Sequence, residues 1–562
     1  MLAKREVVKI FESIGMKNVE NYLEVPVRPE FGDLAFACFE LAKIEKRNPK
    51  EVAEGLVKKI KVSKSSLISK VEAKAGYVNF FFDYTKMAEI LLKEILTKKD
   101  KYGQSDIGKG KRILVEFAHP NTHKGLHIGH FRNICLGESL CKLLEFTGYK
   151  VFRVNYQGDV GPHIAKALWA FINIYGCKVP KEKEKNKAEW LGELYAETEK
   201  RMEDEKVANE VAGINKKLYE GDKEIIKLWK GTRKWSLDYF DEIYKELGTK
   251  FDRFYFESEV GKKGLKISED ILKKGMAKES EGAIIVDLEK YGLGIFVLVS
   301  KDKTPLYPAK DLELAELQFN EFKFDKCIHL VSTEQNLYFK QLFKTLELIK
   351  SPVANKKYHL PYELVTLKEG KMASRLGNVV LYKQLRDKVI EKVLEEMKDR
   401  EMENKEKIAK SVGIGAMKYG MLKVSPEKVI FFDWEEALKL EGNTGPYLQY
   451  AYTRCSGILR KSKKWKAVCK VKELTEHEKI LVKILSRFSE LVEQASNDLR
   501  PSHICNYLYE LATTFNNFYE NCPVLKAEDE QTKNFRLTLV DSTGMVLKNA
   551  LILIGIEALE KM

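Results

Sequence analysis

The stretch from Arg112 to Tyr156 constrains the fold most, because it predicts a strand, a helix and a second strand in direct succession. Arg112–Ala118 and Tyr149–Tyr156 are short apolar runs typical of buried strands, and Gly148 ends the helix that lies between them, from about residue 129 to 147. The apolar positions of that helix are Ile134, Leu136, Leu140, Leu143 and Leu144. Such a βαβ unit is right-handed and builds a parallel sheet. A nucleotide would therefore bind beyond the carboxyl ends of the strands, in the loop before the helix.

That loop is rich in histidine. Four of the nine histidines lie between positions 119 and 130, and these are His119, His123, His127 and His130. They have three interpretations: unrelated structural residues, a metal site, or a cradle for phosphate. Pro120 and Gly125 interrupt any single helix, so the four side chains cannot share one helical face as metal ligands. We favour the cradle, because a helix amino end attracts phosphate, His127 and His130 add N–H donors, and Gly129 leaves room for a flat adenine.

The sequence His127-Ile-Gly-His130 resembles the HIGH motif of class I aminoacyl-tRNA synthetases and of related nucleotidyltransferases. The longer segments from Glu116 to Asn133 and from Val154 to Gly161 resemble the arginyl-tRNA synthetase family in particular. This resemblance implies an α/β fold, with a Rossmann-like parallel-sheet catalytic domain of the class I type. It also implies an α+β domain before the catalytic domain and an all-α anticodon-binding domain after it.

A second segment, Glu369 to Val380, resembles the KMSKS loop of the same enzymes. Lys371 and Met372 match the motif, whereas Ala373 replaces its first serine and Ser374 its second lysine. A cation there would stabilise the pyrophosphate leaving group, and in such family members a lysine just before HIGH is thought to compensate, which here is Lys124. The resemblance thus implies the catalytic residues Lys124, His127, His130 and Lys371, and an ATP site formed by Lys124, His127, Gly129, His130, Lys371, Met372 and Ser374.

The residues that read the amino acid are predicted from chemistry and resemblance together. A guanidinium group needs planar acceptors, best a desolvated carboxylate, and Tyr307 and Asp311 lie four residues apart, on one face of a helix. The family's guanidinium-binding tyrosine and aspartate match these two positions. The arginine-binding residues implied by the resemblance are Glu116, Asn121, Tyr307, Asp311 and Gln335. His119 is a further candidate, because it stands where the family often has serine or alanine.

The RNA-binding parts are predicted at both ends of the chain. The segment Glu441 to Arg454 resembles the start of the family's anticodon-binding domain, whose rings and hydrogen-bonding groups contact unpaired bases. The candidates are Tyr447, Gln449, Tyr450 and Arg454, with Met562 at the carboxyl end and Phe31 in the first domain. The plain alternative is that the tyrosines pack helices together. Ala37 stands where the family often has an asparagine that reads a base.

Composition and patterning complete the domain prediction. The formal net charge of +14 favours encounter with nucleic acid, although a lysine-rich composition alone gives the same charge. We predict domains at 1–107, 108–380 with a helical insertion around 178–280, 381–440 and 441–562. Within the first domain, Leu34, Ala37, Cys38 and Leu41 recur at helical spacing, and Tyr77–Phe82 reads as a buried strand.

The cysteines and the apolar runs indicate in which cellular compartment the protein is expected. Nine scattered cysteines without a CxxC pair suit a reducing environment, no apolar run is long enough for a membrane span, and the first residues lack a signal-peptide core. We therefore expect a cytoplasmic protein.

The predicted function is ligation of L-arginine to tRNA(Arg), with ATP as substrate, Mg²⁺ accompanying ATP, and no structural metal. The expected partners are tRNA(Arg), arginine and ATP, and we expect a monomer. Three rivals remain at this stage: a small-molecule nucleotidyltransferase, an inactive paralogue that only binds RNA or arginine, and a synthetase for another amino acid.

Overall fold

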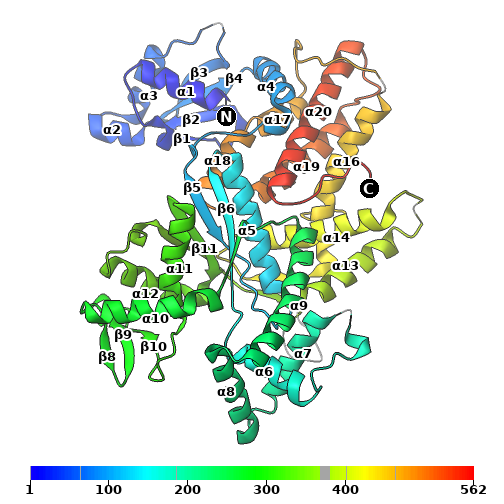
Figure 1. The fold of residues 1–562 in the computed structure, drawn as a ribbon. Coiled ribbons are helices and arrows are strands. Elements are labelled where there is room, and N and C mark those ends of the chain that lie inside the picture. Colours follow the sequence, from blue (N-terminus) through cyan, green and yellow to red (C-terminus); the bar gives the residue numbers. More distant parts are fainter. Residues whose placement is uncertain (1, 64, 185, 368–379, 400, 463) are drawn as a thin grey trace.

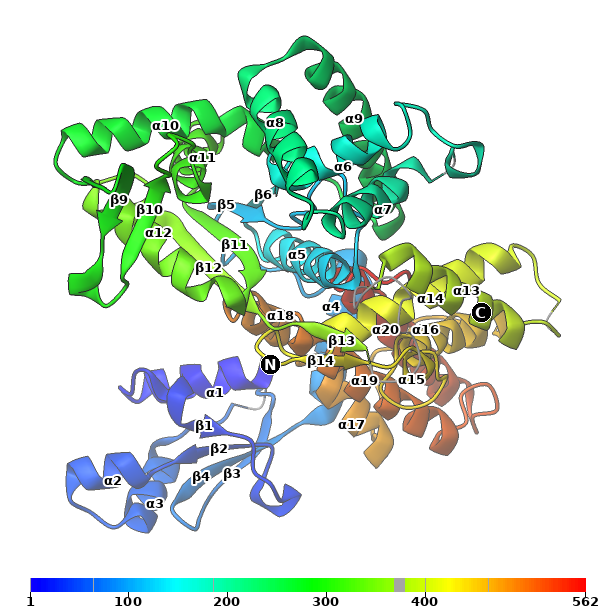
Figure 2. The same cartoon turned by 90° about the horizontal axis from the view of Figure 1, so that it is seen from below.

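The computed structural model describes residues 2–63, 65–184, 186–367, 380–399, 401–462 and 464–562. A parallel sheet lies at the centre, the amino-terminal domain lies beside one end of it, and the carboxyl-terminal part is helical (Figures 1 and 2). This arrangement confirms the predicted fold class. In the part of the chain described, no helix combines the length and the hydropathy needed to cross a bilayer.

The central sheet has five strands, all paired in parallel, in the order β12-β11-β5-β6-β7. The strands are β5 (Arg112–Glu116), β6 (Lys150–Gln157), β7 (Arg253–Phe256), β11 (Lys326–Ser332) and β12 (Lys357–Tyr362). Helix α5 (Ile128–Phe146) links β5 to β6, which confirms the predicted βαβ unit. After β5, the chain adds β6 and then β7 on one side of it, and later adds β11 and then β12 on the other side. The switch point therefore lies between β5 and β11, where ligands of such sheets bind at the carboxyl ends of the strands.

Two insertions flank this sheet. Between β6 and β7 lie four helices with a core of their own: α6 (Pro162–Asn173), α7 (Lys187–Glu199), α8 (Glu205–Glu220) and α9 (Lys223–Leu247). Between β7 and β11 lie α10 (Glu257–Lys273), the antiparallel sheet of β8 (Lys278–Ser280), β9 (Ala283–Asp287) and β10 (Ile295–Val299), and α11 (Tyr307–Phe322). The range predicted as a helical insertion, 178–280, thus also contains β7, a strand of the main sheet. β7 is only four residues long and lies in a charge-rich stretch, so its pattern is too short to recognise.

The amino-terminal domain is an antiparallel sheet in the order β1-β2-β4-β3 with helices around it (Figure 2). Its elements are α1 (Leu2–Ser13), β1 (Leu23–Glu24), β2 (Leu34–Ala37), α2 (Phe39–Glu45), α3 (Pro49–Lys59), β3 (Ile68–Lys74), β4 (Tyr77–Phe82) and α4 (Tyr84–Lys98). The predicted strand at Tyr77–Phe82 is confirmed. The helical pattern at positions 34–41 is wrong in its first half, because pairing with β4 makes Leu34–Ala37 a strand. Tertiary pairing overrides a helical spacing of so few residues.

The carboxyl-terminal part is mostly helical, as predicted. Its helices are α13 (Tyr382–Glu396), α14 (Lys405–Leu422), α15 (Trp434–Ala437), α16 (Gly445–Lys461), α17 (Glu476–Leu485), α18 (Phe488–Asn497), α19 (Ser502–Asn521) and α20 (Glu530–Leu553). Helix α12 (Asn336–Leu348) precedes β12, and β13 (Val365–Leu367) pairs in parallel with β14 (Ile430–Phe432). Helix α5 contacts α14, α18 and α20. One buried helix therefore runs from the histidine loop to the carboxyl-terminal domain (Figure 1).

Candidate active site

The loop after β5 has a strained backbone that the surrounding side chains hold in place. Ala118, His119 and His123 have φ angles of +80°, +52° and +62°, in the left-handed region that side chains other than glycine rarely adopt. Each backbone N–H in turn is bonded to a side chain: Ala118 to Asn133 Oδ1, His119 to Asn155 Oδ1 at 3.2 Å and His123 to Ser236 Oγ at 2.9 Å. Strain of this kind persists only where the surroundings over-determine it, and it is typical of ligand-binding sites.

The four histidines of the loop separate into different roles. His123 is fully buried and joins the loop to α9, with Nε2 at 2.8 Å from Thr232 Oγ1 and Nδ1 at 3.2 Å from Thr122 Oγ1. Burial lowers the pKa of His123 to about 3, so its ring is neutral. His119 contacts the carbonyl of Tyr156, and His127 and His130 contact each other. The four rings do not converge, and among the described residues no three His, Cys, Asp or Glu side chains are grouped as metal ligands.

His127 and His130 cap the amino end of α5 reciprocally. His127 Nδ1 accepts hydrogen bonds from the N–H of Gly129 at 3.1 Å and of His130 at 3.4 Å, and His130 Nδ1 accepts the N–H of His127 at 3.2 Å. An Nδ1 that accepts carries no proton, so each neutral ring holds its proton on Nε2. Burial lowers the pKa of His127 to about 4 and that of His130 well below its ordinary value. Both rings therefore offer an uncharged Nε2–H donor at a helix amino end.

Gly129 and Lys124 are the two other residues predicted to bind phosphate or ATP at this loop. A Cβ on Gly129 would lie 2.9 Å from Cε1 of His127, so a side chain there would displace the capping ring. Lys124 Nζ lies 4.3 Å from the centre of the Tyr195 ring, which belongs to α7 of the helical insertion. Burial lowers the pKa of Lys124, Glu199 opposes that shift, and the Lys124 charge lowers the pKa of His127. The insertion thus places a cation next to the histidine pair.

The second predicted motif lies outside the described residues, and with it Lys371, Met372 and Ser374. The residues that follow this range contact the histidine loop directly. The Ile128 N–H donates to Val380 O at 3.0 Å, and Leu381 forms a β-bridge with His127. A Cβ on Gly125 would lie 2.7 Å from Leu381 Cδ2, so this glycine permits the close approach.

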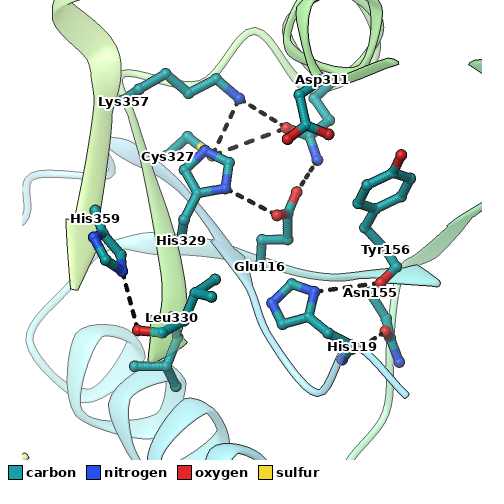
Figure 3. Close-up of polar contacts among 12 residues, drawn as sticks. Glu116, His119, Asn155, Tyr156, Asp311, Cys327, His329, Leu330, Lys357 and His359 are labelled. Carbon is teal, nitrogen blue, oxygen red and sulfur yellow. Dashed lines mark hydrogen bonds and ion pairs between the residues drawn. The ribbon is translucent and has the colours of Figure 1, made fainter. Parts of the chain in front are cut away.

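Asp311, on the first turns of α11, is the charged group of a second part of the site. Its Oδ2 accepts a short hydrogen bond from Tyr338 OH, whereas its Oδ1 is buried and has no partner among the described residues. The hydroxyl of Tyr156 is likewise buried without a partner in the part of the chain described. Burial raises the pKa of Asp311 to about 7. Figure 3 shows that the Tyr156 side chain and Asp311 lie on the same side of the sheet.

Glu116, at the end of β5, is enclosed by hydrogen bonds. His329 Nδ1 donates to Oε1 at 2.8 Å, and Gln318 Nε2 makes a short bond to Oε2 (Figure 3). Lys357 Nζ donates to Gln318 Oε1 at 2.9 Å and adds positive charge. Burial alone would raise the pKa of Glu116, but His329 and Lys357 hold it below its ordinary value. Glu116 therefore carries a negative charge whose oxygens are already occupied by protein donors. These occupied oxygens were not predictable from the sequence.

The remaining predicted arginine-binding residues lie around this region. Asn121 lies within the strained loop, between His119 and His123, and a Cβ on Gly158 would lie 2.4 Å from Asn121 Oδ1, so a glycine after β6 makes room for that amide. Tyr307 is 53% exposed and precedes Asp311 by one helical turn. Gln335 is exposed and lies one turn before Tyr338, next to α12. Sequence reasoning missed Tyr156, Gln318, His329, Tyr338 and Lys357. Two of them had a signal, because Tyr156 belongs to the segment from Val154 to Gly161 that resembles the family, and Tyr338 to the segment that contains Gln335.

The predicted RNA-binding residues of α16 have different surroundings. Tyr450 is 40% exposed, and the Arg454 guanidinium lies 4.9 Å from its ring and 5.4 Å from the ring of Tyr519, which the sequence analysis did not single out. Tyr447 is partly buried and accepts from Asn516 Nδ2 at 2.8 Å. Gln449, however, is fully buried, and its Nε2 donates to Glu557 O at 2.9 Å. This hydrogen bond holds the carboxyl-terminal tail against α16. The Gln449 side chain is therefore not available at the surface, contrary to the prediction that it binds RNA.

The two predicted RNA-binding residues outside α16, Met562 and Phe31, are partly buried. Met562 packs against the hydrophobic core, and the Phe31 ring lies 4.7 Å from Lys74 Nζ.

Three family models match the chain. The model for class I (R) tRNA synthetases, catalytic domain, matches residues 91–434. The DALR anticodon-binding domain matches 448–562, and the arginyl-tRNA synthetase N-terminal domain matches 3–82. The chain belongs to the arginyl-tRNA synthetase family. It is accordingly a class I synthetase with an anticodon-binding domain, and ATP is a substrate of that class.

Individual relatives agree over the full length. The chain is 38% identical to an arginine–tRNA ligase of Clostridium perfringens, over 99% of both chains, and 38% identical to that of Clostridium kluyveri, over 100% of this chain and 99% of the other. The solved arginyl-tRNA synthetase of Thermus thermophilus superposes with a TM-score of 0.82 at 25% identity, covering all of both chains. The Plasmodium falciparum enzyme shares the fold, with a TM-score of 0.79 at 20% identity.

Proposed function

We propose that this chain activates L-arginine with ATP at the switch point between β5 and β11 and transfers it to tRNA(Arg). The arginine–tRNA ligase reaction follows from family membership. The single observation that carries the assignment of residues is the Asp311 carboxylate, which is buried with one oxygen unpartnered among the described residues. A buried carboxylate oxygen without a hydrogen-bond partner costs free energy, and a cationic donor that binds there removes this cost.

The guanidinium of arginine supplies such a donor. Its planar N–H groups pair with a carboxylate in two parallel hydrogen bonds, and its charge lowers the pKa of that carboxylate. Tyr338 fixes the orientation of Asp311 by donating to Oδ2. Tyr156, Tyr307 and Gln335 provide further polar groups at the same edge of the sheet, and Asn121 and Glu116 lie toward the amino and carboxylate groups of the substrate.

ATP binds at the amino end of α5. The Nε2–H groups of His127 and His130 donate to phosphate oxygens, and Lys124 and Lys371 stabilise the charge that grows on the leaving pyrophosphate. Met372 and Ser374, which belong to the same sequence motif as Lys371, contact ATP, and Gly129 leaves space for the adenine. Mg²⁺ enters with ATP as part of the substrate, because phosphates supply most of its ligands.

The first step joins a carboxylate oxygen of arginine to the α-phosphorus of ATP and breaks the bond between that phosphorus and the oxygen that leaves with pyrophosphate. In the second step the oxygen of a ribose hydroxyl at the 3′ end of the tRNA bonds to the arginyl carbonyl carbon, and the bond between that carbon and the phosphate oxygen of AMP breaks. AMP leaves with that electron pair, and its phosphate accepts the hydroxyl proton. Neither step needs a covalent bond to the protein. Positioning and charge stabilisation account for the rate.

RNA binding is proposed at both ends of the chain. Tyr450 and Arg454, with Tyr447 beside them, form a mixed aromatic and basic surface suited to unpaired bases. Met562 lies at the carboxyl end near α16, and Phe31 serves the amino-terminal domain. Helix α5 joins the anticodon-binding domain to the histidine pair, so we propose that RNA binding is required for the first step. We also propose a monomer, because the residues named for the site all belong to one chain, and a location in the cytoplasm, because nine scattered cysteines without a CxxC pair suit a reducing compartment.

A charging assay with a panel of amino acids tests this function. The protein is incubated with ATP, Mg²⁺ and a tRNA carrying an arginine anticodon, and acid-precipitable amino acid is measured. We expect charging with arginine, and none with citrulline, which replaces the cationic guanidinium by a neutral urea group. Equal charging with citrulline, or charging with another amino acid alone, would overturn the assignment of Asp311.

A further inference from the structure

His119 is held by two hydrogen bonds that fix its ring and its protonation pattern. Its backbone N–H donates to Asn155 Oδ1 at 3.2 Å, and its Nδ1 lies 3.3 Å from the carbonyl oxygen of Tyr156. A carbonyl oxygen only accepts, so Nδ1 is the donor of this pair, and the tautomer that fits the contact has its proton on Nδ1. Nε2 is then left with a lone pair. This is the opposite of His127 and His130, whose Nε2 atoms are donors.

That acceptor is buried and has no partner among the described residues. A buried polar atom without a partner costs free energy, and in a native protein it indicates a ligand or a bound water. The backbone of His119 is also held in the left-handed region, with φ of +52°. The fold therefore maintains local strain to hold one imidazole lone pair inside the candidate site.

The neighbours of the His119 ring indicate which part of the candidate site it belongs to. In Figure 3 His119 lies beside Glu116 and Asn155, at the end of the central strands. Burial lowers the pKa of His130, and the nearness of the His127 and His119 rings lowers it further, because neighbouring imidazoles do not readily carry positive charge together. His119 also acts on the pKa of Glu116, after the larger effects of burial and His329. The ring thus lies beside the buried carboxylate and close enough to His130 to influence its pKa.

We infer that His119 Nε2 accepts a hydrogen bond from the α-ammonium group of arginine and thereby helps to select an α-amino acid. This inference rests on the proposed function. The α-ammonium group is the donor of arginine that lies next to the reacting carboxylate, away from the guanidinium that Asp311 binds. Glu116 supplies the negative field for this cation, but its oxygens already accept from Gln318 and His329. His119 supplies the lone pair that Glu116 lacks.

Competitive inhibition of the charging reaction tests this role with two analogues of arginine. Argininol keeps the α-ammonium and loses the carboxylate, whereas 5-guanidinopentanoate keeps the carboxylate and has hydrogen in place of the α-ammonium. In His119→Ala we expect the Ki of argininol and the KM of arginine to rise about 10- to 100-fold, as for loss of a hydrogen bond to a charged group. The Ki of 5-guanidinopentanoate should change less than about threefold, because it has no group for Nε2 to bind.

Two further variants separate the alternatives. His119→Gln offers an amide N–H to Tyr156 O and an amide oxygen in place of Nε2, so it should recover most of the argininol affinity. Asp311→Asn should weaken both analogues together, because both keep the guanidinium. If His119→Ala weakens the two analogues equally, or if it raises the KM of ATP instead, the inference is wrong. If neither analogue inhibits the wild-type protein and arginine is not charged, it is the proposed function that has failed.

Discussion

Asp311→Asn should strongly reduce the activity with arginine and make the free protein more stable. The substitution keeps the shape of the side chain and the acceptor for Tyr338 but removes the charge. A guanidinium left in the pocket without its counter-charge costs about 3–5 kcal/mol, which predicts a loss in kcat/KM for arginine of roughly 150- to 5,000-fold. The KM for ATP should change little, because the histidine pair and Lys124 are untouched.

The effect on stability has the opposite sign and depends on pH. Burial raises the pKa of Asp311 in the folded protein to about 7, whereas an unfolded chain titrates near its ordinary value of 3.8. The folded state therefore binds this proton more tightly, and the stability that the proton confers is lost as pH rises from about 4 through about 7. At pH 8 the ionised Asp311 costs on the order of 4 kcal/mol, a cost that the neutral amide of the variant does not carry.

The assay is the thermal unfolding midpoint of both proteins at pH 5 and pH 8 without arginine. The midpoint of the variant should exceed that of the wild type at pH 8, and the gap should shrink at pH 5. Saturating arginine should stabilise only the wild type. Glu316→Gln, the same change of charge on the same helix, is the control and should alter neither kcat/KM nor this pH dependence. Full activity in Asp311→Asn, or a variant less stable than wild type at pH 8, would refute the reasoning.

Three further substitutions test the remaining parts of the site. His127→Asn keeps an oxygen that can cap α5 but loses the Nε2–H donor, so kcat should fall about 100-fold while the unfolding midpoint stays within a few degrees; an unchanged kcat would show that this histidine only caps the helix. Lys124→Ala should lose most of the activity while still binding tRNA in a filter-binding assay, and near-normal turnover would rule out its compensating role. Arg454→Ala should raise the KM for tRNA about 10-fold without raising the KM for arginine; a normal KM for tRNA would remove α16 from the RNA interface.

The order of the main elements could be predicted because each has a local pattern. The strand, helix and strand from Arg112 to Gln157 carry apolar runs and a stop signal in the sequence itself. The four-residue strands β2 and β7 could not be recognised, because their pairing partners are distant and four residues are too few to distinguish a strand pattern from a helical one. Leu34–Ala37 matched a helical spacing by coincidence, and only pairing with β4 decided the outcome.

The candidate site divides in the same way. His127, His130 and Asp311 lie in motifs, so the sequence alone predicts their neighbourhood. The hydrogen bonds around Glu116 join β5 to Gln318 and His329, about two hundred residues further along the chain, so no local pattern could reveal them. Gln449 shows the converse problem, because a glutamine in an amphipathic helix looks exposed when its amide is in fact buried against Glu557.

Exchange of labelled pyrophosphate into ATP tests the central claim most directly, because it measures formation of the adenylate alone. The reaction is run with arginine, with citrulline and without an amino acid, each with and without tRNA carrying an arginine anticodon. We predict exchange only with arginine and tRNA together, which would join the guanidinium pocket at Asp311, the histidine pair and the RNA-binding domain in one mechanism. Exchange with arginine in the absence of RNA would contradict the coupling through α5, and exchange with citrulline but not arginine would contradict the account of the site.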